Sequence, residues 1–153
     1  RHLYREVAPP MKALAVLAVL FGVMALLRIP TDNSVQEVSH KIVATNYAIY
    51  RNAAFQFAFA HKGYSGDIPL ASLSLPESWR MARTWHARML DGCCYVYGEA
   101  SPEEAEAVRR LFRGSFAIGL AYGGRLAPAT GPHPVPVPSF VPNGNLVSVV
   151  EVS

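Results

Sequence analysis

An uncharged apolar run near the N-terminus constrains this chain more than any other feature. Residues 13–27 read ALAVLAVLFGVMALL and hold no charged or polar side chain. A membrane-spanning helix needs about 20 apolar residues, and Lys12 and Arg28 can extend a shorter run because their side chains reach the two interfaces. We therefore predict a transmembrane anchor over residues 13–29.

Two other interpretations of this run fit less well. A cleaved signal peptide requires small residues at a cleavage site, but the run is followed by Arg28-Ile29-Pro30-Thr31. A buried core helix normally keeps one polar side toward water, which residues 13–27 lack. An uncleaved anchor is therefore the favoured interpretation.

The charges on either side of the run predict its orientation. Basic residues precede it at positions 1, 5 and 12, whereas Arg28 is the one basic residue that closely follows it. The positive-inside rule therefore places residues 1–12 in the cytoplasm and residues 30–153 on the other side of the membrane. Met11 followed by Lys12 would make a natural start of translation, so residues 1–10 are expected to be dispensable.

The remaining composition argues against several classes of protein. The formal net charge of +3 comes largely from the basic head, so the chain from Arg28 onward lacks the basic stripe of a nucleic-acid-binding domain. The two cysteines, Cys93 and Cys94, are adjacent and form neither a disulfide framework nor a zinc motif. In a strand their side chains should point to opposite faces, and the sequence leaves their redox state open.

Residues 30–153 are predicted to form an α+β domain that opens with a long amphipathic helix. Ser34 and Glu37 have the spacing of a capping box, and the helix should end near His61, before Gly63. Its predicted core stripe has the spacing of one helical face and consists of Val38, Ile42, Ile49, Ala53, Phe57 and Ala60.

Three residues of this helix are candidate contacts with a partner. Phe55 and Phe59 point away from the main stripe, so they are either buried in the domain or exposed for binding. Asn46 lies near the centre of the apolar face. There its amide either bonds a neighbouring backbone group or fixes the register against another helix.

Strands and tight turns are predicted farther along the chain. Residues 79–89 alternate between apolar and polar side chains, which favours a strand over 77–90, although the Arg, Met and Ala content keeps a helix open. Asp91-Gly92 predicts a type I′ hairpin turn into the strand CCYVY. Further strands are predicted for SFAIGLAY, closed by two glycines, and for LVSVVEV, preceded by an Asn-Gly turn.

A second helix and two loops complete the predicted domain. Ser101 can cap the helix, Pro102 suits its first position, and Glu104 completes a capping box. Residues 63–76 should form a loop, and residues 127–142, with six of the twelve prolines, a stiff extended loop. The expected architecture is a long amphipathic helix packed on a small antiparallel sheet with one further helix.

A search for catalytic, cofactor-binding and metal-binding motifs finds none in the sequence. The five histidines are scattered without metal-ligand spacing, and GYSG at 63–66 lacks the spacing of a nucleophile elbow. There is no P-loop and no G-x-G-x-x-G. We therefore expect a protein without catalytic activity and without a cofactor.

Five segments follow the predicted anchor in a distinctive order: Tyr50-Arg51-Asn52-Ala53, GDIPLASLSLPESW, GCCYVYG, SFAIGLAYGG and VPNGNLVSVVEV. In this order they resemble the PilM family of type IVb thin-pilus systems, which occur on conjugative plasmids and related bacterial loci. The order of the segments and the total length carry the resemblance, which extends over the chain from Met11.

The resemblance implies a role in pilus assembly at the bacterial inner membrane. Family members are described as small membrane proteins of the pilin transport apparatus and basal body, so other pilus-assembly proteins are the implied partners. Whether copies of the chain form a homo-oligomer stays open. The alternative is a pilin-like or minor-pilin subunit, but a pilin carries a Glu early in its apolar segment, and no acidic residue lies between Glu6 and Asp32.

Overall fold

The computed structural model describes residues 32–115, 117–127 and 133–153. The chain divides into two compact units, Arg1–Gln36 and Glu37–Ser153, and the description below concerns the second. No helix in the described part of the chain is both long and apolar enough to cross a membrane. The predicted anchor over 13–29 lies outside the described residues.

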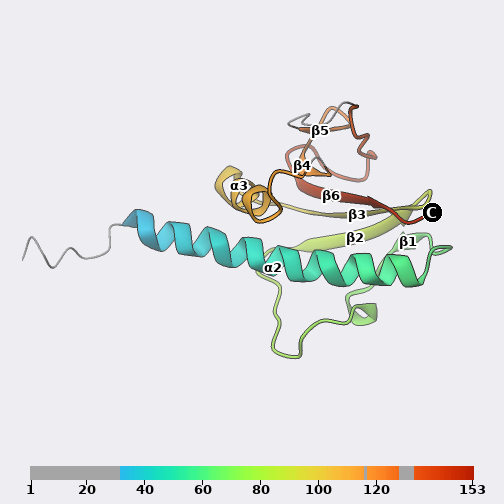
Figure 1. The fold of residues 1–153 in the computed structure, drawn as a ribbon, viewed down its shortest axis with the longest axis horizontal. Coiled ribbons are helices and arrows are strands. Elements are labelled where there is room, and N and C mark those ends of the chain that lie inside the picture. The colour runs from blue at the N-terminus through green and yellow to red at the C-terminus, as the bar shows by residue number, and fades with distance from the viewer. Residues whose placement is uncertain (1–31, 116, 128–132) are drawn as a thin grey trace, which may run out of the picture. The chain divides into compact units, whose positions relative to one another are not determined.

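The described residues form one long helix, one shorter helix and a single antiparallel sheet (Figure 1). The helices are α2, Asp32–Ala60, and α3, Pro102–Leu111, with a short 3-10 turn at Leu70–Ser72. The strands are β1 Gly66–Asp67, β2 Trp85–Leu90, β3 Cys93–Gly98, β4 Ile118–Tyr122, β5 Arg125–Ala127 and β6 Leu146–Glu151. Their order in the sheet is β1-β2-β3-β6-β4-β5. The predicted α+β class is confirmed.

Local turn chemistry sets the strand pairing. Asp91 and Gly92 adopt φ values of 50° and 74°, as a type I′ turn requires, and Leu90 pairs with Cys93 across the hairpin. Gly123 and Gly124 make the equivalent left-handed turn between β4 and β5, with φ values of 56° and 73°. The predicted Asp-Gly and Gly-Gly turns are confirmed.

Each face of the sheet packs against a different layer. On one face, residues of β2, β3 and β6 pack against α2 and α3, and Cys94 belongs to this core. On the other face, Tyr95, Tyr97 and Val147 pack against Val137 and Val141 of the proline-rich loop, and Cys93 borders this second core. The predicted opposite orientation of the two cysteines is confirmed, and both are free thiols.

The helix α3 follows its sequence signals closely at both ends. Ser101 accepts a hydrogen bond from the Glu104 N–H, and the Glu104 carboxylate accepts one from the Ser101 N–H, so the predicted capping box is confirmed. At the other end, Arg113 is left-handed, with φ of 53°, and the Gly114 N–H donates to the Arg109 carbonyl. This is the Schellman arrangement.

Two expectations about helices and strands are wrong, and two short strands were missed. Ser34 lies inside α2 and is not its cap, because Asp32 and Asn33 are already helical. The strand predicted over 77–90 begins at Trp85, and neither a strand nor the alternative helix forms over 77–84. The short strands β1 and β5 were not predicted, because two or three residues carry too little periodicity.

The predicted core stripe of α2 is right in part: Ala53 is buried in the core and Phe57 packs against it, but the first members of the stripe are exposed. Val38 and Ile42 are 57% and 61% exposed, whereas Tyr47 and Ala54 are completely buried. The face that packs on the sheet therefore consists mainly of small and aromatic side chains, together with Val43. In Figure 1, α2 runs along the sheet on this buried face.

The Tyr47 hydroxyl is the polar centre of the α2–sheet contact. It donates to the Val96 carbonyl at 2.8 Å and lies 2.7 Å from the Ser148 hydroxyl, and both partners belong to paired strands. Burial raises the pKa of Tyr47, so this hydroxyl stays protonated and remains a donor.

The variant Tyr47→Phe should lower the free energy of unfolding by about 1–3 kcal/mol, because it leaves buried polar groups on β3 and β6 without their partner. Urea denaturation checks this, with Tyr122→Phe as the matched control because Tyr122 is 54% exposed. Equal stability of both variants would contradict the assignment.

Candidate interaction surfaces

Asn46 lies beside the connection between β1 and β2, and both the nitrogen and the oxygen of its amide form hydrogen bonds there. Its Nδ2 donates to the Arg80 carbonyl at 2.7 Å, and its Oδ1 accepts from the Ala82 N–H and from the Trp85 Nε1, both at 2.9 Å. These bonds agree with the first of the two interpretations made from the sequence, in which the Asn46 amide bonds backbone groups of its own chain. A contact between Asn46 and a partner helix stays a prediction that nothing here tests.

The two candidate phenylalanines lie in different surroundings. Phe55 is 8% exposed and belongs to the core between α2 and the sheet. Phe59, one turn farther along α2, is 51% exposed. Burial favours a structural role for Phe55, whereas the placement of Phe59 leaves it available to a partner.

Arg51 was not singled out from the sequence, yet it has unusual surroundings. Its guanidinium carbon lies 4.3 Å from the centre of the Phe55 ring and 4.4 Å from that of Phe112. Burial lowers the pKa of Arg51, and its Nε is buried without a hydrogen-bond partner. Cation–π contacts with the two rings therefore offset the burial of its charge. The Arg51–Phe55 spacing of four residues on a helix was the available signal.

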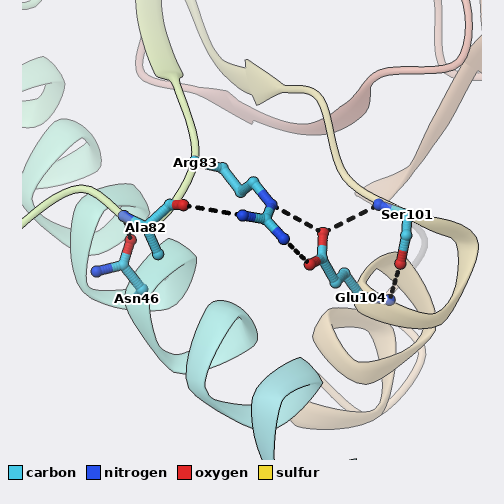
Figure 2. Close-up of polar contacts among 5 residues, drawn as sticks. All are labelled: Asn46, Ala82, Arg83, Ser101 and Glu104. Atoms are coloured by element: carbon cyan, nitrogen blue, oxygen red, sulfur yellow. Dashed lines mark hydrogen bonds and ion pairs between the residues drawn. The ribbon is translucent and has the colours of Figure 1, made fainter. Parts of the chain in front are cut away.

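A series of polar contacts joins the β1–β2 connection to both helices (Figure 2). Arg83 donates from Nη1 to the Ala82 carbonyl at 3.2 Å and from Nη2 to Glu104 Oε1 at 2.6 Å. Glu104 in turn accepts from the Ser101 N–H at 3.0 Å. Because Ala82 also donates to Asn46, the connection is held between α2 and α3.

Glu104 is the buried member of this series of contacts. Its side chain is 4% exposed, whereas the side chain of Arg83 is 48% exposed. Burial opposes its ionisation, but the hydrogen bonds from Arg83 and the Ser101 N–H outweigh that cost, so the pKa of Glu104 lies below its ordinary value. Its position in the first turn of α3 also suits a negative charge. The pair of Arg83 with Glu104 therefore joins the segment before β2 to the start of α3.

A groove of about 750 Å³ separates α2 from α3. Its charged groups are mostly paired on their own helix: Lys41 bonds Glu37 at 2.9 Å, and Glu106 bonds Arg109 and Arg110 at 3.2 Å. Between these pairs the groove is lined by small side chains, including Ala44 and Ala107. The groove is suited to apolar side chains.

The described residues show no arrangement typical of catalysis at neutral pH. No group of three or more His, Cys, Asp or Glu side chains among them could hold a metal ion. Burial raises the pKa of Tyr50 and of the Cys94 thiol to about 12, so both stay protonated and unreactive. The polar side chains of Asn46, Tyr47 and Glu104, of which Tyr47 and Glu104 are buried, bond within the fold.

Comparisons with known proteins agree on one family. The PilM family model matches residues 16–149. A crystal structure of a protein identified only by the name PilM, from Escherichia coli B7A, has the same fold with a TM-score of 0.56 and 18% sequence identity. The match covers 75% of this chain and 94% of that one. No curated protein matches the chain.

The two phenylalanines should respond differently to truncation. Phe55→Ala should cost about 3–5 kcal/mol of stability, because it opens a cavity in the core and removes one of the rings that sandwich Arg51. Phe59→Ala should leave thermal melting nearly unchanged, since half of that side chain is already exposed to solvent. Similar melting of the two variants would show that their burial has been assigned wrongly.

The Arg83–Glu104 pair should make stability depend on acid. Because the pKa of Glu104 is lower in the folded chain, its ionisation stabilises the fold above about pH 4.3, and that stabilisation is lost as the pH falls through the folded value. Glu104→Gln should therefore flatten the acid limb of a stability–pH curve. Glu106→Gln, at an exposed pair, is the control and should leave that limb unchanged.

Proposed function

Because this chain belongs to the PilM family of pilus proteins, we propose that it is a non-enzymatic inner-membrane component of a type IVb pilus-assembly apparatus. It acts through its surface, as a periplasmic scaffold that holds other assembly proteins. The observation that carries the proposal is the family match over residues 16–149, which includes most of the apolar run.

The proposed membrane location rests on the sequence of the N-terminal segment. The run over residues 13–27 has no charged side chain, and the basic residues cluster before it. A single-pass anchor in this orientation carries the folded domain on the periplasmic side. The apparatus that moves pilins to the outside is a fitting partner for such a domain.

The proposed scaffold role rests on the distribution of polar and apolar groups. Polar side chains such as those of Asn46, Tyr47 and Glu104 form hydrogen bonds between elements of the domain itself. Large apolar side chains, by contrast, are exposed along α2, including Val38, Ile42 and Phe59. Exposed apolar side chains are typical of interaction surfaces.

Two reporter fusions after Ser153 test the location. A reporter that is active only in the periplasm should be active there, and one that is active only in the cytoplasm should be inactive. The reverse result would overturn the proposed orientation. N-terminal sequencing of the protein from cells distinguishes the anchored protein from the alternative, a pilin-like subunit. A pilin should be processed and begin near Val23, whereas an uncleaved anchor should begin at or before Met11.

Deletion of the gene should abolish pilus assembly, and the wild-type chain should restore it. Phe59→Ala should fail to restore assembly although its melting is unchanged, because truncating a central interface aromatic costs about 2 kcal/mol or more of binding. Tyr122→Ala is the matched control, since Tyr122 is equally exposed, on β4. Full restoration by Phe59→Ala would remove this residue from the partner surface.

A further inference from the structure

A row of polar side chains lies at one end of the sheet, on the face that packs against the proline-rich loop. Tyr97 of β3 pairs with His86 of β2, and β3 pairs with β6 on its other side. Two residues farther along these three strands, the same register places Thr84, Glu99 and Asn145 next to one another. Because side chains alternate along a strand, all three share the face of Tyr97.

These side chains line a cleft of about 680 Å³, which is within the range of small-ligand sites. The strands and the proline-rich loop both contribute to it, the loop through Phe140 and Pro142. We call it the strand-end cleft and define it by Thr84, His86, Tyr97, Glu99, Phe140 and Asn145.

Two polar side chains of the strand-end cleft are buried without a hydrogen-bond partner in the described part of the chain. Tyr97 is 9% exposed and Asn145 is 7% exposed. The Asn145 backbone bonds Ala121 and Pro142, but its side-chain amide bonds no described residue, and neither does the Tyr97 hydroxyl. The fully buried side-chain atoms that lack a partner belong to other residues, so these two groups are still open to the cleft. Since buried polar groups are normally hydrogen-bonded, two that face a cleft without partners indicate a ligand.

The charge in the strand-end cleft disfavours an anionic ligand. Arg83 also lines the cleft, but its guanidinium is already paired with Glu104 at 2.6 Å (Figure 2). Glu99 is exposed and forms no ion pair with any residue that the structure describes. Its carboxylate would repel a phosphate or a second carboxylate.

We propose that the strand-end cleft binds a neutral sugar. The Asn145 amide both donates and accepts hydrogen bonds, as do the hydroxyls of Thr84 and Tyr97, and the Glu99 carboxylate accepts them. Sugar hydroxyls also donate and accept, and a neutral sugar brings no charge to oppose Glu99. This site goes beyond the proposed scaffold role and does not depend on it.

Aromatic rings in the strand-end cleft suit the apolar C–H face of a sugar ring. His86 is exposed and stacks on Tyr97, with the ring centres 5.3 Å apart. The ring centre of Phe140 lies 5.7 Å from that of Tyr97. The face of an aromatic ring carries partial negative charge, so it attracts weakly positive C–H groups. Burial raises the pKa of Tyr97, so its hydroxyl stays protonated beside these rings and can donate to the sugar.

A peptide strand is a less suitable occupant of this cleft. In the sheet, β3 lies between β2 and β6, and β6 lies between β3 and β4, so both strands already have neighbours on both sides. Peptide binding by strand addition needs an unpaired sheet edge. The strand-end cleft therefore offers side chains to a ligand, as recognition of a sugar requires.

Titration of the full chain with oligosaccharides tests the proposal, in a detergent that has no sugar headgroup. The probes are linear oligosaccharides of N-acetylglucosamine and of glucose, and tri-lysine tests whether the Glu99 charge alone attracts a ligand. We expect at least one oligosaccharide to bind, observed by saturation-transfer NMR, and tri-lysine not to bind.

Two variants locate the binding in the cleft. Tyr97→Phe should weaken binding about 3- to 10-fold, because it removes one hydrogen bond to the sugar. Its thermal melting should be unchanged, since the hydroxyl has no partner among the described residues. Asn145→Ala should weaken binding at least as much. Tyr122→Phe is the matched control, and it should leave both binding and melting unchanged because Tyr122 is exposed on β4.

The outcomes separate the sources of the sugar and the failures of the proposal. Tighter binding of the N-acetylated oligosaccharide would support the site and identify an N-acetylated glycan as its ligand, and equal binding of both would support recognition of hydroxyls alone. The proposal is overturned if neither oligosaccharide binds, if only tri-lysine binds, or if both cleft variants bind as the wild type does. A clear drop in the melting temperature of Tyr97→Phe would also overturn it, because the hydroxyl would then be bonded within the domain.

Discussion

Close packing of α2 on the sheet is the constraint on which the rest of this domain depends. Alanines at positions 44, 54 and 58 are almost completely buried, which lets the helix backbone approach the strands closely. Tyr47 fills the space between them and places its hydroxyl on two adjacent strands. Because α2 occupies this face, the connection that follows it must run beside the helix and be held by Asn46 and Arg83.

Much of the sheet could be predicted because its signals are local. The hairpin turn at Asp91-Gly92 and its two strands lie in one stretch from Trp85 to Gly98, and the cap and first turn of α3 are local in the same way. The short strand β1 could not be predicted in this way, because it exists only through pairing with β2, more than 20 residues away. Its two residues carry no periodicity of their own.

The core face of α2 was predicted wrongly at Val38 and Ile42 for a physical reason. Branched aliphatic residues such as Ile42 are more hydrophobic than alanine, so periodicity assigns them to the core. Burial in this domain is decided instead by fit to the sheet, where small side chains and Tyr47 allow a closer approach. The same limit applies to the candidate contact residues. Periodicity could not tell which of the two phenylalanines is buried, and the structure places Phe55 in the core and Phe59 outside it. The pair of Arg83 with Glu104 joins residues 21 apart, and no local pattern predicts such a contact.

The two faces of α2 have different physical roles, and this difference connects fold to function. One face contributes to the stability of the domain through buried alanines, Tyr47 and the sandwiched Arg51. The other exposes side chains to water at a cost that the fold itself does not offset. Such exposure persists in a stable protein when another surface covers it in the assembled state. Under the proposed function, other pilus-assembly components would provide that surface, and the exposed apolar side chains of α2 would then belong to a larger assembly.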